Sequence, residues 1–275
     1  MTADFKAILL KARHQVYTLL SGHNLSRLHG EGYDFAELRE YQVGDDIRKI
    51  NWTITAKLGK PYIKELHANR ELSVAVAAIL DGSLFVGTDN SKQQVFTEVA
   101  SLLGYAAQHS GDLFTGIGYT DTGTFSTPPT KQLFEIERFC EEIYRFDALH
   151  TNVTCQNAIE NLFGRIHKPS LLFVLHDFLE PVDLSVLAQR HEVIAIIIRH
   201  REEEILGQRA HTLLHDPRTG REQEHYLRSQ SRRNYLARRK AHDEKLLAHF
   251  SQYGIRYVKI FTDETAVEKL VRLFA

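Results

Sequence analysis

The sequence predicts an α/β fold built on a doubly wound, mostly parallel β-sheet. The segment from Leu72 to Phe85 begins as a continuous apolar run and then breaks into Asp81-Gly82-Ser83. A run without polar alternation is typical of a strand that is buried on both faces of a parallel sheet. A second apolar run begins at Leu171 and ends in the same way, at His176-Asp177. Because segments of helical periodicity separate such runs, the sequence indicates βαβ units.

The other expected elements follow in chain order. A first helix, from about Asp4 to Leu20, has apolar residues at helical spacing and ends at Ser21-Gly22. A helix opened by a capping box of Ser91 and Gln94 supplies the crossover after the central strand. The remaining predictions are strands at 113–119, 123–127, 193–198 and 255–261, helices at 131–145, 155–166, 229–253 and 264–274, a short helix capped by Asp183, and a hairpin at 211–226.

Composition and charge limit the class of partner. The 275 residues are 43% hydrophobic and 25% charged, with a formal net charge of -1. This neutral balance argues against a protein dedicated to nucleic acid or to membrane surfaces. The sequence shows no signal-like apolar region and no stretch long enough to span a bilayer, so we expect a cytoplasmic protein. Cys140 and Cys155 lack metal-ligand spacing, and we expect reduced thiols.

The segment from Gly30 to Glu65 is dense in charge, aromatic residues and glycines, without clean periodicity. It closely resembles the signature of a bacterial family, the domain-of-unknown-function family 58, whose motif has the form G-x-G-x-E-F-x-x-L-R-E-Y-x-x-G-D-D-x-R-x-I-D-W. Asp34, Asn51 and Lys57 depart mildly from that pattern. The residues in register are Gly30, Gly32, Phe35, Leu38, Arg39, Glu40, Tyr41, Gly44, Asp45, Asp46, Arg48, Ile50 and Trp52.

Two interpretations of this signature stay open. Its charged residues could form a buried clasp that fixes the amino-terminal arm to the α/β domain, since buried ion pairs specify geometry more reliably than they add stability. They could equally form a surface that binds a partner. The residues concerned are Arg39, Glu40, Tyr41, Gly44, Asp45, Asp46, Arg48 and Trp52.

The resemblance implies a von Willebrand factor A-like α/β domain after the signature. Residues 1–70 then form an amino-terminal helix and signature arm, and residues 71–275 form the α/β domain, with the hairpin and long helix inserted at about 205–253. Proteins of this family are commonly associated with MoxR-type AAA+ ATPases, as adaptors in the assembly or maturation of larger complexes. The resemblance therefore implies a protein partner of that kind.

The resemblance also implies a magnesium site. If the strand order is 3-2-1-4-5-6, the strands that end at Asp81 and Asp177 are neighbours where the order reverses, and both acids face one crevice. Von Willebrand A-like domains hold Mg²⁺ there through a D-x-S-x-S motif, a loop threonine and a second aspartate, all of which offer the oxygen ligands that Mg²⁺ prefers. The implied ligands are Asp81, Ser83, Thr151 and Asp177.

Two features of the implied ligand set leave alternatives. Phe85 stands at the third motif position and cannot coordinate a metal, so the site is either a functional ion site or a degenerate remnant. Thr151 could equally cap a helix beside Thr154. Asp81-Gly82-Ser83 could also be a plain strand-to-loop turn.

Two other functions are alternatives to a non-enzymatic interaction module. A Mg²⁺-dependent phosphoester hydrolase would use Asp81 and Asp177, although Ile79 stands where a haloacid-dehalogenase phosphatase needs its nucleophilic aspartate. A nucleic-acid binder would use the basic helix at 228–245, but interspersed acids favour a solvated helix face. His211 and His215, four residues apart on an expected strand, are poorly placed for zinc. We therefore expect a protein-binding module and no enzyme activity.

Overall fold

A computed structural model describes residues 3–23, 34–42, 44–67, 71–86, 92–204, 211–226 and 229–274. These residues belong to two compact units, one comprising Met1–Thr18 with Leu72–Ala275 and the other comprising Leu19–Glu71. The sequence prediction grouped the first helix with the signature arm. In the structure, this helix, α1 (Ala3–His23), belongs to the α/β unit as far as Thr18.

The α/β unit contains a six-stranded sheet in the order β10-β7-β6-β3-β4-β5. Read from the β5 edge and numbered along the chain, the strands of this sheet run 3-2-1-4-5-6, as expected. All neighbouring pairs are parallel except the antiparallel pair of β4 and β5. The predicted α/β class is therefore confirmed. The strands are β3 (Ser73–Ile79), β4 (Leu113–Thr120), β5 (Gly123–Ser126), β6 (Leu171–His176), β7 (Glu192–Arg199) and β10 (Arg256–Phe261).

The central strand β3 is buried on both faces, as its uninterrupted apolar sequence predicts. From Val74 to Leu80 no residue is more than 6% exposed. β3 pairs with β4 on one side and with β6 on the other, so that Ala78 lies opposite both Gly118 and Leu175. Residues that follow the carboxyl ends of β3 and β6 therefore emerge next to one another at the same edge of the sheet.

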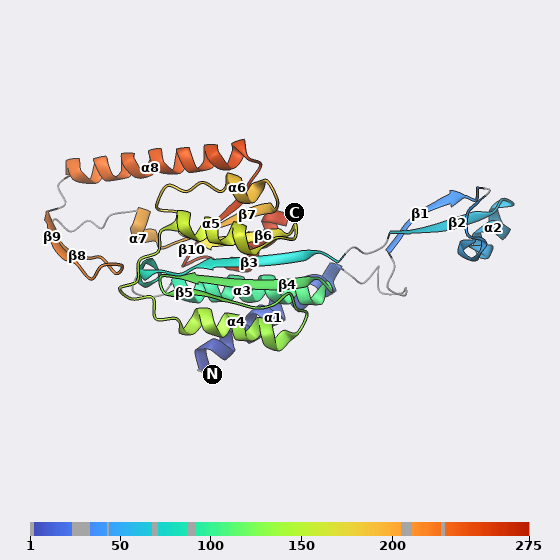
Figure 1. Ribbon diagram of the computed structural model, residues 1–275, viewed down its shortest axis with the longest axis horizontal. Helices are drawn as coiled ribbons and strands as arrows, with labels where there is room; N and C mark the ends of the chain where they lie inside the picture. The colour runs from blue at the N-terminus through green and yellow to red at the C-terminus, as the bar shows by residue number, and fades with distance from the viewer. Residues whose placement is uncertain are drawn as a thin grey trace. The chain divides into compact units, whose positions relative to one another are not determined.

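Helices cover both faces of the sheet (Figure 1). On one face, α5 and the carboxyl-terminal half of α8 enclose a core with alternate residues of β3, β6 and β7. On the other face lie α3 and α4, with α1 beside α4 through the rings of Phe5 and Tyr144, and with α9 beside α3. The helices of this unit, besides α1, are α3 (Lys92–His109), α4 (Leu133–Arg145), α5 (Cys155–Arg165), α6 (Ser185–Ala188), α7 (Arg201–Glu204), α8 (Ser229–Gln252), α9 (Ala266–Phe274) and the 3-10 turn η2 (Gly82–Phe85).

The long helix α8 is held by a buried arginine. Arg199, at the end of β7, is fully buried and donates hydrogen bonds to both carboxylate oxygens of Asp243, at 3.0 and 2.9 Å, and to Glu204. Among the described side chains of α8, only Leu246 and Phe250 are buried. The helix is therefore fixed by its carboxyl-terminal half and by this ion pair.

A two-stranded hairpin precedes α8, where the sequence predicts one. Its strands are β8 (His211–His215) and β9 (Glu222–Tyr226), which pair antiparallel. The turn between them closes through the amide of Gly220, which donates to the carbonyl of Asp216. A glycine suits this position because its φ is +69°.

The signature unit has secondary structure that its sequence did not predict. β1 (Asp34–Glu40) pairs antiparallel with β2 (Tyr62–His67), and the chain between them forms η1 (Ile47–Lys49) and α2 (Trp52–Leu58). Polar side chains set the starts of these turns, since Asp46 accepts from the amide of Arg48 and Asn51 accepts from the amide of Ile54. Gly59, in the left-handed region, ends α2.

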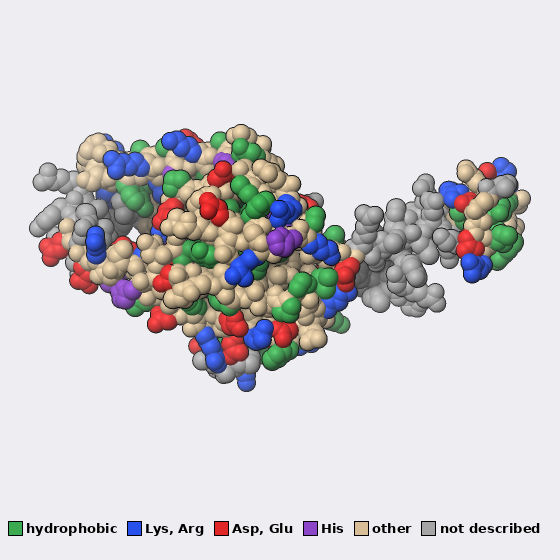
Figure 2. Space-filling view, in the orientation of Figure 1, with side chains coloured by type: hydrophobic (Ala, Val, Ile, Leu, Met, Phe, Trp, Pro, Cys, Tyr) green, Lys and Arg blue, Asp and Glu red, His purple; other side chains and the backbone are tan. Residues whose placement is uncertain are grey.

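Over the described residues, no helix has the length and apolar character required to cross a membrane. Figure 2 shows acidic and basic side chains intermixed over the visible face of the α/β unit, without a field of one sign. This mixed distribution agrees with the nearly neutral composition.

Candidate functional site

Two buried acids mark the point where the strand order reverses. Asp81 follows β3 and is fully buried, and Asp177 follows β6 and is 1% exposed. Both carboxylates face the guanidinium of a single arginine, Arg218, so they lie in one crevice at the carboxyl edge of the sheet. Ligand sites in open parallel sheets occupy this place.

Arg218 comes from the turn of the β8–β9 hairpin and enters the crevice. Its Nε lies 2.9 Å from Oδ2 of Asp81, and its Nη2 lies 3.8 Å from Oδ2 of Asp177. The third nitrogen, Nη1, donates a hydrogen bond to Glu180. One guanidinium therefore pairs with three carboxylates that come from two different strand ends.

A second internal cation lies on the other side of Asp177. Lys92, at the start of α3, is fully buried, and its Nζ donates to Oδ2 of Asp177 at 3.1 Å and to Oε1 of Glu203 at 2.7 Å. Charged side chains are almost never fully buried unless they are paired. The two acids at the strand ends are thus neutralised by Lys92 and Arg218.

The other two predicted ligands lie close by but are engaged. The amide of Ser83 donates to Oδ1 of Asp81 at 2.9 Å, and the Ser83 hydroxyl bonds to Asp177. Thr151 lies beside η2 because its carbonyl accepts from the amide of Gly82 at 2.9 Å, but its hydroxyl donates to the carbonyl of Ala148 at 2.7 Å. The structure thus brings all four residues together, with Thr151 contributing its backbone.

The backbone of the hairpin turn packs directly on the strand-end loop. The amide of His150 donates to the carbonyl of Pro217 at 2.8 Å. A Cβ atom at Gly82 would lie 2.4 Å from that same carbonyl oxygen and 2.7 Å from Cα of Arg218. Only glycine allows so close an approach, which explains the residue between Asp81 and Ser83.

The electrostatics of the crevice favour the ionised form of Asp177. Burial alone would raise the pKa of Asp177, but the nearby positive charges, Lys92 foremost and Arg218 among them, hold that pKa well below its usual range. Since one pKa unit corresponds to about 1.4 kcal/mol, the cations strongly stabilise the charged form. Asp177 is therefore an anion whose charge is already balanced within the chain.

This arrangement does not fit a bound Mg²⁺ ion. The guanidinium of Arg218 occupies the space between the two acids, and Lys92 takes a remaining oxygen of Asp177. Phe85, at the third motif position, is exposed and offers no oxygen. Within the described ranges, no three His, Cys, Asp or Glu side chains gather in a way that could hold a metal ion. The magnesium site stays a prediction that these contacts disfavour.

Sequence reasoning missed the residues that complete the crevice. Lys92 lies 85 residues from Asp177 and 111 residues from Glu203 in the sequence. Arg218 likewise lies far along the chain from Asp81, its partner in the crevice. The sequence signals were a lysine at the start of the crossover helix and an arginine in a predicted turn. Neither distinguishes a buried charge from an exposed one.

The ion pairs that the structure describes for the signature residues lie within their own unit. Both terminal nitrogens of Arg39 donate to the carboxylate of Asp45, at 2.8 and 2.7 Å, and Asp45 also accepts from the amide of Gln42. Arg48 pairs with Asp46, and Glu40 pairs with Lys60. These contacts shape the turn after β1.

The other signature residues carry no charge. The amide of Tyr41 donates a hydrogen bond to the carbonyl of Pro61. Gly44 has a φ of +113°, a conformation that favours glycine, and the side chain of Trp52 is 66% exposed.

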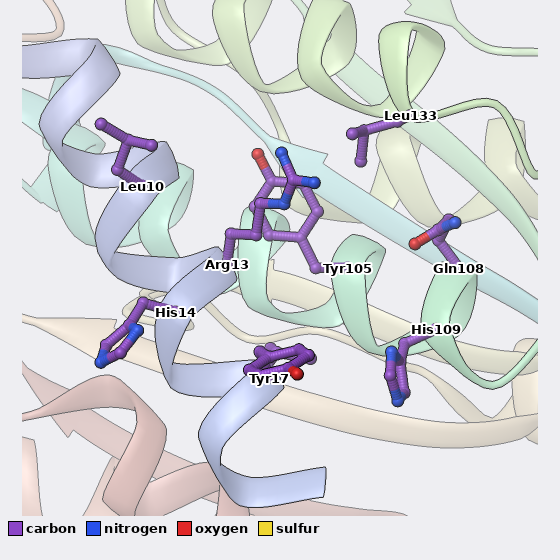
Figure 3. A pocket seen from close by; sticks show the side chains of 9 residues that line it. Leu10, Arg13, His14, Tyr17, Tyr105, Gln108, His109 and Leu133 are labelled. Carbon is purple, nitrogen blue, oxygen red and sulfur yellow. The ribbon is translucent and has the colours of Figure 1, made fainter. Parts of the chain in front are cut away.

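A separate hollow of about 460 Å³ lies between α1 and α3 (Figure 3). Arg13 and Tyr17 of α1 face it, together with Tyr105 and His109 of α3. α3 begins at the carboxyl edge of the sheet and ends at His109, near the start of β4, so this hollow belongs to the opposite edge. The described residues that line it include no carboxylate to orient a catalytic base.

Comparison with known proteins places the chain among relatives of unknown function. The sequence profile of the family "Protein of unknown function DUF58" matches residues 37–245. The chain belongs to the DUF58 family. This confirms the family expected from the signature, and the match includes the crevice acids and Arg218 as well as most of the signature.

Two curated relatives of this DUF58 protein are uncharacterized proteins, Mb1516 of Mycobacterium bovis and Rv1480 of Mycobacterium tuberculosis. Each is 22% identical over 282 residues, which cover 100% of this chain and 89% of the relative. A solved structure, the conserved hypothetical protein BatB from Bacteroides thetaiotaomicron, matches with a TM-score of 0.42 and 10% identity over 74% of this chain and 96% of that one.

Proposed function

We propose that this DUF58 protein is a non-enzymatic adaptor that binds a MoxR-type AAA+ ATPase in the assembly or maturation of protein complexes. One observation carries the proposal: the signature unit exposes large apolar side chains. Trp52, Ile47 and Leu58 are 66%, 61% and 58% exposed, although they belong to or adjoin the family motif. Exposed apolar side chains gathered on one small unit are typical of a surface that binds another protein.

The chemistry of this surface suits protein recognition. Its described ion pairs, such as Arg39 with Asp45 and Arg48 with Asp46, join residues close in sequence and hold the turns that present Trp52. Aromatic residues are enriched in protein interfaces, and tryptophan is among the residues that most often dominate their energetics. The choice of an AAA+ ATPase as the partner follows from the family resemblance.

The crevice gives no support to the hydrolase alternative. A general base must be able to take up a proton, and a metal-dependent enzyme needs open coordination positions. Asp81 and Asp177 instead pair with internal cations, Arg218 and Lys92. The basic helix also gives little support to nucleic-acid binding, because Arg239 pairs with Glu204 and Asp243 inside the chain.

The test is a binding titration between the purified full chain and a purified MoxR-type ATPase. Trp52→Ala is expected to weaken binding by about tenfold or more, because truncating a central aromatic anchor typically costs about 2 kcal/mol. Phe134→Ala is the matched control, since Phe134 is 69% exposed on α4 of the α/β unit. It should leave the dissociation constant unchanged.

The controls separate the possible failures. Equal effects of Trp52→Ala and Phe134→Ala would contradict the assignment of the binding surface to the signature unit. No binding by the wild-type chain, with or without nucleotide on the ATPase, would contradict the adaptor proposal itself. Circular dichroism of each variant establishes that the α/β unit is folded.

A further inference from the structure

The hairpin turn is built to deliver a guanidinium into the crevice. Pro217 receives the hydrogen bond of the His150 amide, and Gly82 removes the side chain that would keep the turn away. These two contacts fix the backbone at Pro217 and at the Arg218 Cα atom. Arg218 therefore enters the crevice from a backbone that is itself docked there.

The charges that face the crevice require cations. Asp81 and Asp177 are buried, and an unpaired buried carboxylate is strongly destabilising. Arg218 and Lys92 each contribute one positive charge, and together they supply the charge of a single divalent cation. The predicted Mg²⁺ and the two side chains are thus alternative ways to neutralise the same pair of acids.

The contacts of Arg218 are those of a guanidinium rather than of a point charge. Its three nitrogens face three different carboxylates, those of Asp81, Asp177 and Glu180. A planar fork of donors can address several acids at once, which the compact ammonium of lysine does less well. Although Nε lies 2.9 Å from Oδ2 of Asp81, this oxygen and Nη2 of Arg218 are both buried without an aligned hydrogen bond. The crevice thus holds unused hydrogen-bonding capacity around the guanidinium.

We propose that the crevice beside Asp81 and Asp177 is a guanidinium-binding site, that Arg218 is its ligand within the same chain, and that the protein needs no divalent cation there. Arg218 occupies the position predicted for Mg²⁺. The inference concerns the crevice alone and does not depend on the adaptor function. It implies that binding of a partner elsewhere on the chain is indifferent to Mg²⁺ at this site.

The first experiment uses the wild-type chain. Its calorimetric titration with MgCl₂ should give no saturable heat beyond that of Asp81→Asn, because Arg218 already holds the acids. Saturable Mg²⁺ binding by the wild type that is lost in Asp81→Asn would overturn the proposal. This experiment needs no substitution at Arg218.

The second experiment is chemical rescue. Arg218→Ala should lower the melting temperature, and methylguanidinium chloride should then raise it more than NaCl of equal ionic strength does. Arg221→Ala is the control, since Arg221 lies in the same hairpin with an exposed side chain, and neither it nor the wild type should gain from methylguanidinium. An unchanged melting temperature in Arg218→Ala, or no specific rescue, would contradict the guanidinium site.

A third variant covers the case in which Arg218→Ala does not fold. Arg218→Lys keeps the positive charge and loses the fork, so it should melt below the wild type and remain indifferent to MgCl₂. A melting temperature equal to that of the wild type would mean that any cation suffices and that the site does not select a guanidinium. Failure of Arg218→Ala to fold, with Arg221→Ala folded and Arg218→Lys of intermediate stability, supports the proposal.

Discussion

Lys92, which shares Asp177 with Arg218, is a single residue on which the stability of the folded protein depends strongly. Lys92 is fully buried between Asp177 and Glu203. A buried ion pair is weak evidence for net stability, but removal of one partner leaves an uncompensated charge in the interior. The loss expected from a substitution is therefore much larger than the contribution of the pair.

Lys92→Met should destabilise the protein by about 3–5 kcal/mol, because it keeps much of the apolar stem but leaves Asp177 and Glu203 facing each other without their shared cation. Urea unfolding followed by circular dichroism measures this change. Lys11→Met is the control: Lys11 pairs with Glu98 at 2.8 Å but is largely exposed. That change should cost about 1 kcal/mol or less. Similar costs for the two variants would mean that the crevice charges are solvated.

At the scale of elements, the hairpin turn and η2 form one packed contact. η2 begins at Gly82, whose missing side chain admits Pro217 and Arg218, and the amide of His150 reports on the same contact through its hydrogen bond. A backbone atom cannot move aside as the end of a flexible side chain can. An added methyl group at Gly82 must therefore displace the turn.

Gly82→Ala should raise the hydrogen-exchange rate of the His150 amide by about tenfold or more, because displacement of the turn removes the acceptor on Pro217. Exchange measured by NMR or mass spectrometry tests this. Gly164→Ala in α5 is the matched control, since no heavy atom lies within 4 Å of its added Cβ. It should leave the His150 exchange rate unchanged and stabilise the helix by about 0.5–1 kcal/mol. Equal exchange rates in both variants would contradict the docked turn.

The elements of the α/β unit were predictable because each is coded locally. The uninterrupted apolar run of β3 and the helical stripe of α3 each report on their own burial. The strand order itself was expected from the resemblance to von Willebrand A-like domains. The partners of Asp81 and Asp177 were not predictable, because a turn arginine such as Arg218 has the same local sequence whether it is solvated or buried. The secondary structure of the signature unit was missed because its charged and aromatic residues follow neither a helical nor a strand period.

At the scale of the whole molecule, the chain divides into units of very different size. The unit of Leu19–Glu71 is small, and units of this size bury a smaller fraction of their surface than larger domains do. Of its hydrophobic side chains that the structure describes, Ile63 is the buried one, at 3% exposure. The stability of so small a unit depends strongly on whether it folds alone or as a clasp on the α/β unit.

Fluorescence can show whether the signature unit folds alone or as a clasp on the α/β unit. Trp52 is the one tryptophan of the sequence, so its fluorescence reports on the signature unit. If the unit folds independently, fluorescence should change at a lower urea concentration than circular dichroism, which follows the larger α/β unit. Ile63→Ala should then lower only the fluorescence midpoint, and Ile159→Ala, in the core beside α5, only the circular dichroism midpoint. Superimposed curves that shift together in both variants would instead mean that the two units unfold as one, which is the behaviour of a clasp.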